Sequence, residues 1–457
     1  MSVENEQLGL WKNSLFVRLF SANIFSLLGT GIMTVALSLL AYQLQPDSAG
    51  ALLGSLLAVK MVAYLLVAPI AGSVAEKFSR KAWIIYANVM RIVAILMLPF
   101  VSEVWHVFVI IFLINSATAA YTPIYQALIA DVLPNEKDYN VAMGYSRIAF
   151  DLESLVSPML AVFFLLFMPF EQLFIVTGIS LVFALMSFLL SAIPTFKANK
   201  SLGEQSVFNR LFFGIKCYTG TPRLRGLLGL HWVVSCGSSM TIVNTVVYVR
   251  EYLSLSEDRV GLTLAAAGSG AMLIAFIIPR FLDQNNIRKI MVCSAGVSVA
   301  TLFSISLLPS YAGMLVLWFI QGMAISGILT PSGLLLRMSC SEKDRTAYFS
   351  SNFALSHGLW FFAYLGTGWI AATIGIANCA VLMAIASLVG LLYALSQWPK
   401  ERSFSLEHRH DLDSNNMIEH VEAHGSQDIT RRSQQIVHTH HFVLDENHKH
   451  WPSKNVK

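Results

Sequence analysis

The stretch Gly72-Ser-Val-Ala-Glu76-Lys77-Phe-Ser79-Arg80-Lys81 separates two apolar segments, residues 50–70 and 82–100. Each segment has about the 20 residues that an α-helix needs to cross a hydrocarbon core of about 30 Å. The connection is short and carries three basic residues, as cytoplasmic loops of membrane proteins often do. It therefore predicts two membrane-spanning helices joined on the cytoplasmic side.

The composition of the whole chain extends this prediction. Of the 457 residues, 55% are hydrophobic and only 13% are charged, and the mean hydropathy is +0.60, which lies outside the range of soluble domains. Apolar segments long enough to span a bilayer recur twelve times. They are residues 15–41, 50–70, 82–100, 105–129, 141–168, 171–193, 226–250, 259–279, 289–309, 311–336, 346–372 and 375–396.

Lysine and arginine residues gather in alternate connections between these segments, which places both termini in the cytosol by the positive-inside rule. The net charge of +4 follows from this topology, and no basic patch interleaved with aromatic residues indicates nucleic-acid binding. The first apolar segment is too long for a cleavable signal peptide, so we expect it to remain as a helix.

The second half of the chain repeats features of the first. Glu136-Lys137-Asp138 recurs 206 residues later as Glu342-Lys343-Asp344, and Arg80-Lys81 recurs as Arg288-Lys289. Tandem halves with a binding site between them are common in secondary transporters. The predicted domains are a cytoplasmic N-terminus (1–14), a six-helix bundle (15–193), a cytoplasmic linker (194–225), a second six-helix bundle (226–396) and a cytoplasmic tail (397–457).

The Gly72–Lys81 stretch and the two six-span halves together resemble the major facilitator superfamily, whose signature at this position reads G-x-x-x-D-R-x-G-R-K/R. Glu76, Lys77 and Ser79 here replace the usual Asp, Arg and second Gly. The resemblance covers about residues 10–396. It implies an all-α membrane protein with 12 transmembrane helices in two six-helix pseudo-repeats.

The resemblance also implies a cytoplasmic gate at this loop. Gly72 would allow two helices to approach closely, and Glu76, Arg80 and Lys81 would join a charge cluster that holds the halves together when the outside is open. Asp131, at the cytoplasmic end of the fourth span, is the expected partner of Arg80. The alternative is that these charges only fix the topology.

A finer resemblance points to the exporter branch that includes drug and siderophore efflux proteins. Within it, three runs look like bacterial nickel-resistance exporters. These runs are Leu28-Gly-Thr-Gly-Ile-Met-Thr-Val-Ala-Leu37, Lys60-Met-Val-Ala-Tyr-Leu-Leu-Val-Ala-Pro69 and Arg147-Ile-Ala-Phe-Asp151-Leu-Glu153-Ser-Leu-Val-Ser-Pro158.

Four ionisable residues lie near mid-depth in the predicted spans, namely Lys60, Asp151, Glu153 and His357. Buried charges are costly in a bilayer and usually serve transport. At the 206-residue offset of the repeat, Asp151 corresponds to His357, and oxygen and nitrogen ligands of this kind suit a divalent first-row metal. Both groups can also exchange protons. Lys60 is the natural counter-charge, and its span neighbours that of His357 in the implied fold.

Static roles are the alternatives for these residues. Lys60 can be the fixed partner of an acid, and His357 can be a packed side chain. Arg147 lies one turn before Asp151 and can form a simple pair with it. Because Glu153 points about 200° away from Asp151 around the helix, at most one of the two carboxylates faces a given cavity.

No phosphate-binding loop, zinc-protease motif, nucleophile elbow or dinucleotide fingerprint occurs in the sequence. We therefore expect no enzymatic activity and an ion gradient as the source of energy. Proton exchange is the preferred coupling, because carboxylates and a histidine are available, and sodium is the alternative.

The segment from Lys400 onward is polar, mixed in charge and poor in aromatic residues, as expected of a disordered tail. Nine of the twelve histidines fall in it, and the tail resembles the histidine-rich ends of nickel exporters. Imidazoles at such spacings can bind nickel, cobalt, copper or zinc, while a solvated tail without a task is the alternative. The candidate ligands are His408, His410, His420, His424, His438, His440, His441, His448 and His450.

The sequence therefore predicts a proton-coupled exporter of a divalent transition metal, nickel or cobalt first, in the inner membrane of a bacterium. One alternative keeps the fold but exports an organic compound such as a drug or siderophore. A more distant alternative is a membrane metal sensor that does not transport. We expect a monomer without a cofactor, apart from a transported or tail-bound metal ion, and its partners are the lipid bilayer, the solute and protons.

Overall fold

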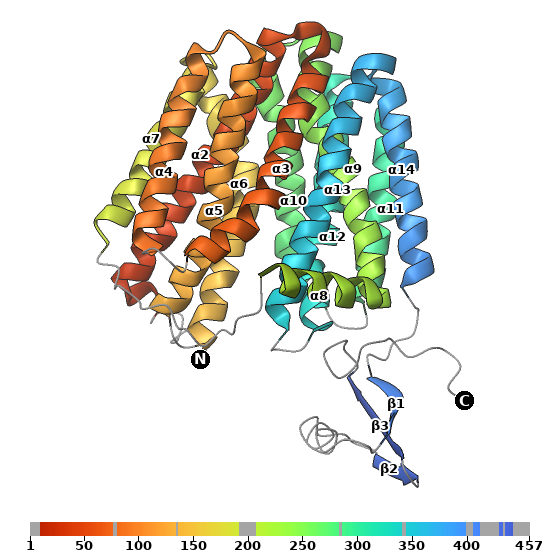
Figure 1. Ribbon diagram of the computed structural model, residues 1–457. Helices are drawn as coiled ribbons and strands as arrows, with labels where there is room; N and C mark the ends of the chain where they lie inside the picture. Colours follow the sequence, from red (N-terminus) through yellow and green to blue (C-terminus); the bar gives the residue numbers. More distant parts are fainter. Residues whose placement is uncertain are drawn as a thin grey trace.

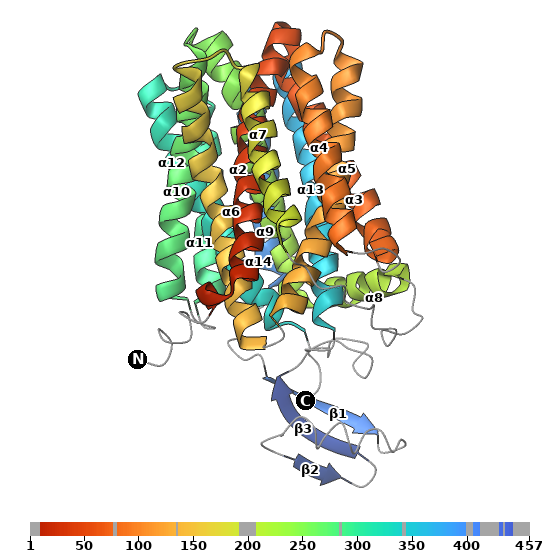
Figure 2. The same cartoon turned by 90° about the vertical axis from the view of Figure 1, so that its left-hand side faces the viewer.

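The computed structural model describes residues 10–75, 80–133, 136–191, 207–282, 286–340, 344–398, 405–411, 429–432 and 435–441. Long helices of these residues run side by side in one bundle (Figures 1 and 2). The first half contains α2 (Ser14–Leu44), α3 (Ala49–Ala75), α4 (Arg80–Met97), α5 (Val104–Val132), α6 (Glu136–Leu165) and α7 (Gln172–Leu189). The second half contains α9 (Pro222–Val247), α10 (Glu257–Ile277), α11 (Ile287–Ile305), α12 (Tyr311–Arg337), α13 (Arg345–Ile374) and α14 (Ile376–Gln397).

Short helical turns extend or connect several of these helices. The 3-10 turns are η1 (Pro46–Ser48), η2 (Leu98–Phe100) and η4 (Ile278–Arg280), and a π-helical turn, η3 (Tyr248–Tyr252), continues α9. Each of the three 3-10 turns has a proline at its first or second position, where the missing N–H costs no hydrogen bond.

Ten helices of the described residues are long and apolar enough to cross a membrane, so the chain is a multi-pass membrane protein. Helix α6 is not among the ten, because its apolar segment, Val156–Leu165, is too short. Helix α13 is not among the ten either. Both helices carry residues that the sequence places at mid-depth. At 30 residues each, they are among the longest helices of the bundle.

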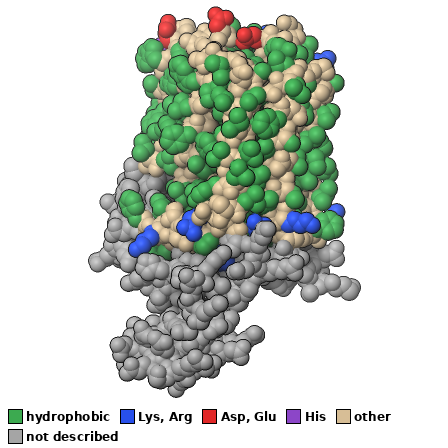
Figure 3. Space-filling view, turned by 90° about the vertical axis from the view of Figure 1, so that its right-hand side faces the viewer, with side chains coloured by type: hydrophobic (Ala, Val, Ile, Leu, Met, Phe, Trp, Pro, Cys, Tyr) green, Lys and Arg blue, Asp and Glu red, His purple; other side chains and the backbone are tan. Residues whose placement is uncertain are grey.

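The surface of the bundle is a broad apolar belt (Figure 3). On the face shown in Figure 3, Lys and Arg side chains lie mainly at one end of this belt, and Asp and Glu side chains lie at the other. The basic end is where α2 begins and α14 ends (Figure 1). We call it the near end, and the acidic end the far end.

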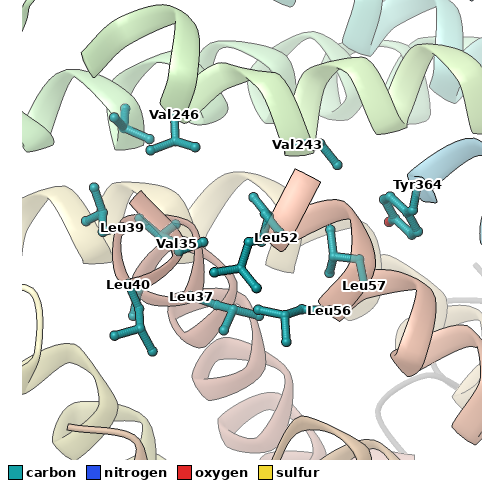
Figure 4. Packing of buried hydrophobic residues seen from close by; sticks show 14 of the residues in the cluster. Val35, Leu37, Leu39, Leu40, Leu52, Leu56, Leu57, Val243, Val246 and Tyr364 are labelled. Atoms are coloured by element: carbon teal, nitrogen blue, oxygen red, sulfur yellow. The ribbon is translucent and has the colours of Figure 1, made fainter. Parts of the chain in front are cut away.

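Among the residues that the structure describes, the two halves share an apolar core toward the far end. One apolar cluster there combines the last turns of α2 and the first turns of α3 with α9, α13 and α14. Figure 4 shows Val35, Leu39 and Leu52 opposite Val243 and Val246 of α9. At the near end each half has its own cluster, one built from residues 10–188 and one from residues 217–398. The halves are therefore joined at the far end and have separate cores at the near end.

Contact between the halves runs along two helix pairs, α3 with α13 and α6 with α10. At Gly54 of α3, an added Cβ atom would overlap the carbonyl oxygen of Tyr364 on α13. Only glycine permits this approach, which is the way small residues bring helices together in a membrane. Glycine in the α3–α13 pair thus fixes the distance between the two halves.

The linker contains a helix that the sequence analysis did not predict. Helix α8 (Val207–Gly220) lies within the segment expected to be a polar connection, and α9 begins at Pro222, before the expected residue 226. Helix α8 crosses the near end of the bundle (Figure 1) and packs on α13. Its Gly214 lies against the carbonyl oxygen of Ala347, so the docking depends on a residue without a side chain.

The tail also differs from the expectation of disorder. Three short strands, β1 (Ser405–Asp411), β2 (Ile429–Arg432) and β3 (Gln435–His441), form an antiparallel sheet in the order β1-β3-β2. The polar composition of the tail predicted no regular structure. The β-branched residues Ile436, Val437 and Thr439 nevertheless favour an extended backbone, and pairing on both sides of β3 satisfies its hydrogen bonds.

Candidate functional site

Glu153 lies on α6 at the point where that helix meets α2. An added Cβ atom at Gly31 of α2 would lie 3.2 Å from Cγ of Glu153 and would overlap Ser157, one turn further along α6. The absence of a side chain at Gly31 therefore lets α2 approach the acid directly. This acid is one of the two carboxylates that the sequence places near mid-depth.

Two cations lie near this carboxylate. Lys60 on α3 and Arg91 on α4 are both close enough to Glu153 to interact with it electrostatically. The Nζ atom of Lys60 lies 5.7 Å from the centre of the Tyr64 ring, one turn further along α3. Among the described side chains, the charge balance near Glu153 is thus two positive side chains to one negative side chain.

Sequence analysis did not single out Arg91, although an arginine inside the apolar segment 82–100 was the available signal. Its side chain is 2% exposed. Nη1 donates a hydrogen bond to Oγ of Ser26 at 2.8 Å, and Nη2 donates to Oγ1 of Thr30 at 2.9 Å. Its Cζ atom lies 5.9 Å from the centre of the Tyr121 ring. Two hydroxyls of α2 therefore hold a buried guanidinium beside Glu153.

His357 continues this polar group into the second half. Its ring stacks on Phe353 at 3.8 Å between ring centres and lies 5.6 Å from the Tyr64 ring of α3. Its Nδ1 atom is 2.7 Å from the carbonyl oxygen of Phe353. Lys60 and His357 interact electrostatically, as expected for residues on neighbouring helices α3 and α13. This polar group therefore crosses the boundary between the halves. It consists of Lys60, Arg91, Glu153 and His357.

Beside His357, a hydrogen-bonded chain leads from His231 to the linker helix. His231 on α9 interacts electrostatically with His357, and its Nε2 atom is 3.1 Å from Oδ1 of Asn352 on α13. The Tyr218 hydroxyl of α8 donates to the same Oδ1 atom at 3.0 Å. This chain gives the buried His231 a specific partner on α13.

Several expected site residues are only partly covered by the structure. Arg147 and Asp151 lie on α6, Gly72 on α3, Asp131 on α5 and Arg80 at the start of α4, but their side-chain environments are outside the described part. Glu76 lies outside the described residues altogether.

Lys81 has a defined role within the first half. Its Nζ atom donates to the carbonyl oxygens of Leu189 at 3.3 Å and Ser191 at 2.7 Å. A lysine that binds the last carbonyls of a helix stabilises its C-terminus. In this conformation Lys81 therefore joins α4 to the end of α7 and makes these bonds within its own half.

Tail histidines are placed by strand register alone. His408 and His410 lie on β1, and His438, His440 and His441 lie on β3. His420, His424, His448 and His450 are outside the described residues. Among the side chains that the structure describes, no group of three His, Cys, Asp or Glu residues could hold a metal ion.

A second polar group, which the sequence did not reveal, lies at the far end. The guanidinium of Arg250 lies 5.4 Å from the centre of the Tyr42 ring, and its Nη2 atom is 3.9 Å from Oε1 of Glu257. These side chains line a pocket of about 400 Å³ between the halves, together with Gln43, Glu171 and apolar residues of the first half. This group holds the far end together alongside the shared apolar core.

The fold and this cross-boundary polar group define the class of protein, and comparison with known proteins agrees. The model of the Major Facilitator Superfamily matches residues 19–231 and 227–412, and the chain belongs to that superfamily. It is thus a transporter and not an enzyme.

Individual relatives are distant. The chain is 23% identical over 423 residues to the uncharacterized MFS-type transporter YvqJ of Bacillus subtilis (strain 168), covering 88% of this chain and 96% of the relative. A nucleoside transporter, NupG, superimposes with a TM-score of 0.66 at 14% identity, over 84% of this chain and 99% of its own. A D-xylose-proton symporter superimposes with a TM-score of 0.65 at 14% identity, over 85% and 98%. At these identities the structures establish the fold alone.

Proposed function

We propose that the chain is a proton-coupled exporter in which Glu153 binds the proton. The observation that supports this is the electrostatic interaction of Glu153 with Lys60 and Arg91, together with that of Lys60 with His357 of the other half. An ionised Glu153 offsets part of the positive charge of Lys60 and Arg91. A protonated Glu153 does not, so proton binding changes the electrostatic energy of Lys60 at the boundary between the halves.

This change provides a route from protonation to conformation. Lys60 and Tyr64 lie on α3, and α3 packs along α13, one of the two contacts between the halves. Alternating access requires such contacts to be remade in each cycle. We propose that loss of the Glu153 charge weakens one arrangement of the α3–α13 contact and favours the other.

We further propose that all twelve long helices span the inner membrane of a bacterium, with both termini in the cytosol. The Lys and Arg side chains at the near end support this orientation by the positive-inside rule (Figure 3). The separate cores at the near end and the shared core at the far end then correspond to a state that faces the cytosol.

The charge balance of the described site favours an organic cargo. A divalent cation near Glu153 would be repelled by Lys60 and Arg91, whereas a neutral or anionic solute would not. We therefore propose an organic solute with a neutral or acidic group, which is the second of the two transport hypotheses that the sequence allows.

Export of nickel or cobalt is the other candidate, and the tail supports it. Five tail histidines fall on strands of the described sheet, and imidazole nitrogen is a favoured ligand of both metals. Under this hypothesis, the tail would raise the metal concentration at the near end of the bundle. The site around Glu153 would then have to accept a metal cation.

Transport assays with reconstituted vesicles can separate the two. Purified chain in liposomes that enclose a pH-sensitive dye is given a proton gradient, and nickel, cobalt and a panel of organic acids and neutral drugs are added in turn. Proton movement that depends on an organic solute supports the proposal. Movement that depends only on nickel or cobalt supports the second candidate, and movement with neither contradicts proton-coupled export of both classes.

A further inference from the structure

Helices α9 and α14 of the second half pack closely and run in opposite directions (Figure 1). An added Cβ atom at Gly229 of α9 would overlap the carbonyl oxygen of Gly390 on α14. One turn further along α9, Nε1 of Trp232 donates a hydrogen bond to the carbonyl oxygen of Ala386 at 3.1 Å. These two contacts set the register of the antiparallel pair.

Each of these helices carries a cysteine and a methionine on the face that meets the other. Two turns after the glycine contact, α9 places Cys236, and Met240 follows one turn later. Two turns before the glycine contact, α14 places Met383, and Cys379 precedes it by one turn. The antiparallel register therefore puts Cys236 level with Met383 and Met240 level with Cys379. All four side chains are buried, and we call them the sulfur cluster.

Contacts with two polar residues join the sulfur atoms of the cluster. Nδ2 of Asn244 lies 3.1 Å from Sδ of Met240 and 3.7 Å from Sγ of Cys379. On α13, Oγ1 of Thr367 lies 3.2 Å from Sδ of Met383. The carbonyl oxygen of Thr367 lies 3.4 Å from Sγ of Cys379. The two cysteines also interact electrostatically, so sulfur atoms of both helices share one buried region.

An unpartnered polar atom lies beside this cluster. Oδ1 of Asn244 is buried and has no hydrogen-bond partner among the described residues. It lies 3.1 Å from the position of a Cβ atom added to Gly50 of α3. Gly50 lines a pocket of about 550 Å³ at the far end, which Asp47 and Glu251 also line. Asn244 therefore lies between the sulfur cluster and a pocket whose carboxylates attract cations.

We propose that the sulfur cluster binds one soft monovalent metal ion, Cu⁺ or Ag⁺, through a cysteine thiolate and the thioethers of both methionines. Sulfur ligands of these two kinds select Cu⁺. The cysteine that binds the ion releases its proton to the solvent. One monovalent ion on one thiolate adds no net charge, whereas a divalent ion would leave a charge that is costly inside a membrane protein.

Apolar packing is the competing explanation, because buried methionine and cysteine side chains also fill cores. Exchange of methionine for leucine separates the two, since it keeps the volume but removes the sulfur atom. The informative variant therefore combines Met240→Leu with Met383→Leu. Met291→Leu is the matched control, because Met291 is equally buried on α11 and lies outside the cluster.

The test is competition for Cu⁺ between the purified full chain in detergent and a coloured Cu⁺ chelator, without oxygen and with a reductant. We expect one tightly bound ion per chain and a loss of affinity of about tenfold or more in the double methionine variant. Met291→Leu should bind as the parent does, and so should Cys293→Ser, which removes an exposed thiol. X-ray absorption by the bound copper should show sulfur ligands.

Equal affinity in the parent and the double methionine variant would overturn the proposal. Copper held by nitrogen ligands alone would also overturn it, because the ion would then lie on the histidines of the tail. The double variant should retain solute-dependent proton flux in vesicles, since the sulfur cluster belongs to the second half and Glu153 to the first. Failure of the metal site and failure of the proposed transport mechanism are thereby distinguished.

Discussion

The aromatic ring of Tyr42 and the guanidinium of Arg250 lie 5.4 Å apart and join the two halves at the far end of the bundle. Arg250 is held in place by a hydrogen bond from Nη1 to the carbonyl oxygen of Leu255 at 2.9 Å and by its contact with Glu257. The Tyr42 ring also packs against the shared apolar core. Its contact with Arg250 stabilises the arrangement in which the far end is closed.

Replacing the ring should loosen that closure. Tyr42→Leu removes a cation–π contact worth about 0.5–1 kcal/mol at an exposed site, which corresponds to about a two- to fivefold faster amide exchange over residues 248–253. Hydrogen–deuterium exchange of the purified chain measures this. Tyr42→Phe keeps the ring face and should behave as the parent, and equal exchange in Tyr42→Leu would refute the role of the contact.

Gly31 should be intolerant of a side chain. Gly31→Ala places a methyl group against Ser157 and beside Glu153, and overpacking of this kind costs about 1–3 kcal/mol. Thermal unfolding in detergent should show the loss, and Ser157→Gly should partly restore stability in the double variant. Gly296→Ala is the matched control, because nothing lies within 4 Å of its added Cβ atom. A tolerated Gly31→Ala would show that α2 and α6 are further apart than described.

Arg91 should contribute to stability as well as to the charge balance. Arg91→Leu removes the bonds to Ser26 and Thr30, and hydrogen bonds with a charged partner contribute about 1.5–3 kcal/mol in soluble proteins. We expect a lower unfolding temperature and weaker proton flux. Thr30→Val removes one of the two acceptors and should have a smaller effect on both. An Arg91→Leu chain with the stability and flux of the parent would exclude Arg91 from the site.

The link between α8 and the bundle is tested at Tyr218. Burial raises the pKa of the Tyr218 phenol above its ordinary value, so the hydroxyl stays protonated and donates to Asn352 throughout the physiological pH range. Tyr218→Phe removes a bond worth about 0.5–1.5 kcal/mol and should speed amide exchange over α8 by about two- to twelvefold. Tyr393→Phe on the exposed face of α14 is the control. Unchanged exchange in Tyr218→Phe would mean that the apolar contacts of α8 hold it without this bond.

Apolar run length was enough to predict the long helices, because a bilayer leaves few alternatives for such segments. The resemblance also placed Lys60 and His357 on neighbouring helices. Arg91 was missed because one arginine barely changes the hydropathy of a span, and its partners Ser26 and Thr30 lie on a different helix. The contact between Tyr42 and Arg250 was missed for the same reason, because the two residues lie far apart in the sequence.

Segments outside the bilayer were harder to predict. Helix α8 was missed because polar composition dominates the linker, while its docking depends on contacts such as Gly214 with Ala347. The tail strands were missed for a related reason, since pairing between β1 and β3 is a non-local property. The roles expected for Asp151 and for the gate residues Glu76, Arg80 and Asp131 stay predictions.

Proton-driven transport by a Glu153→Gln chain tests the central claim most directly. In vesicles loaded with a transported solute, this variant should lose accumulation driven by a proton gradient but retain solute exchange without a gradient, because the carboxamide cannot carry the proton. Glu103→Gln, on an exposed loop, should retain both activities. Gradient-driven accumulation by Glu153→Gln at the parent rate would contradict the account.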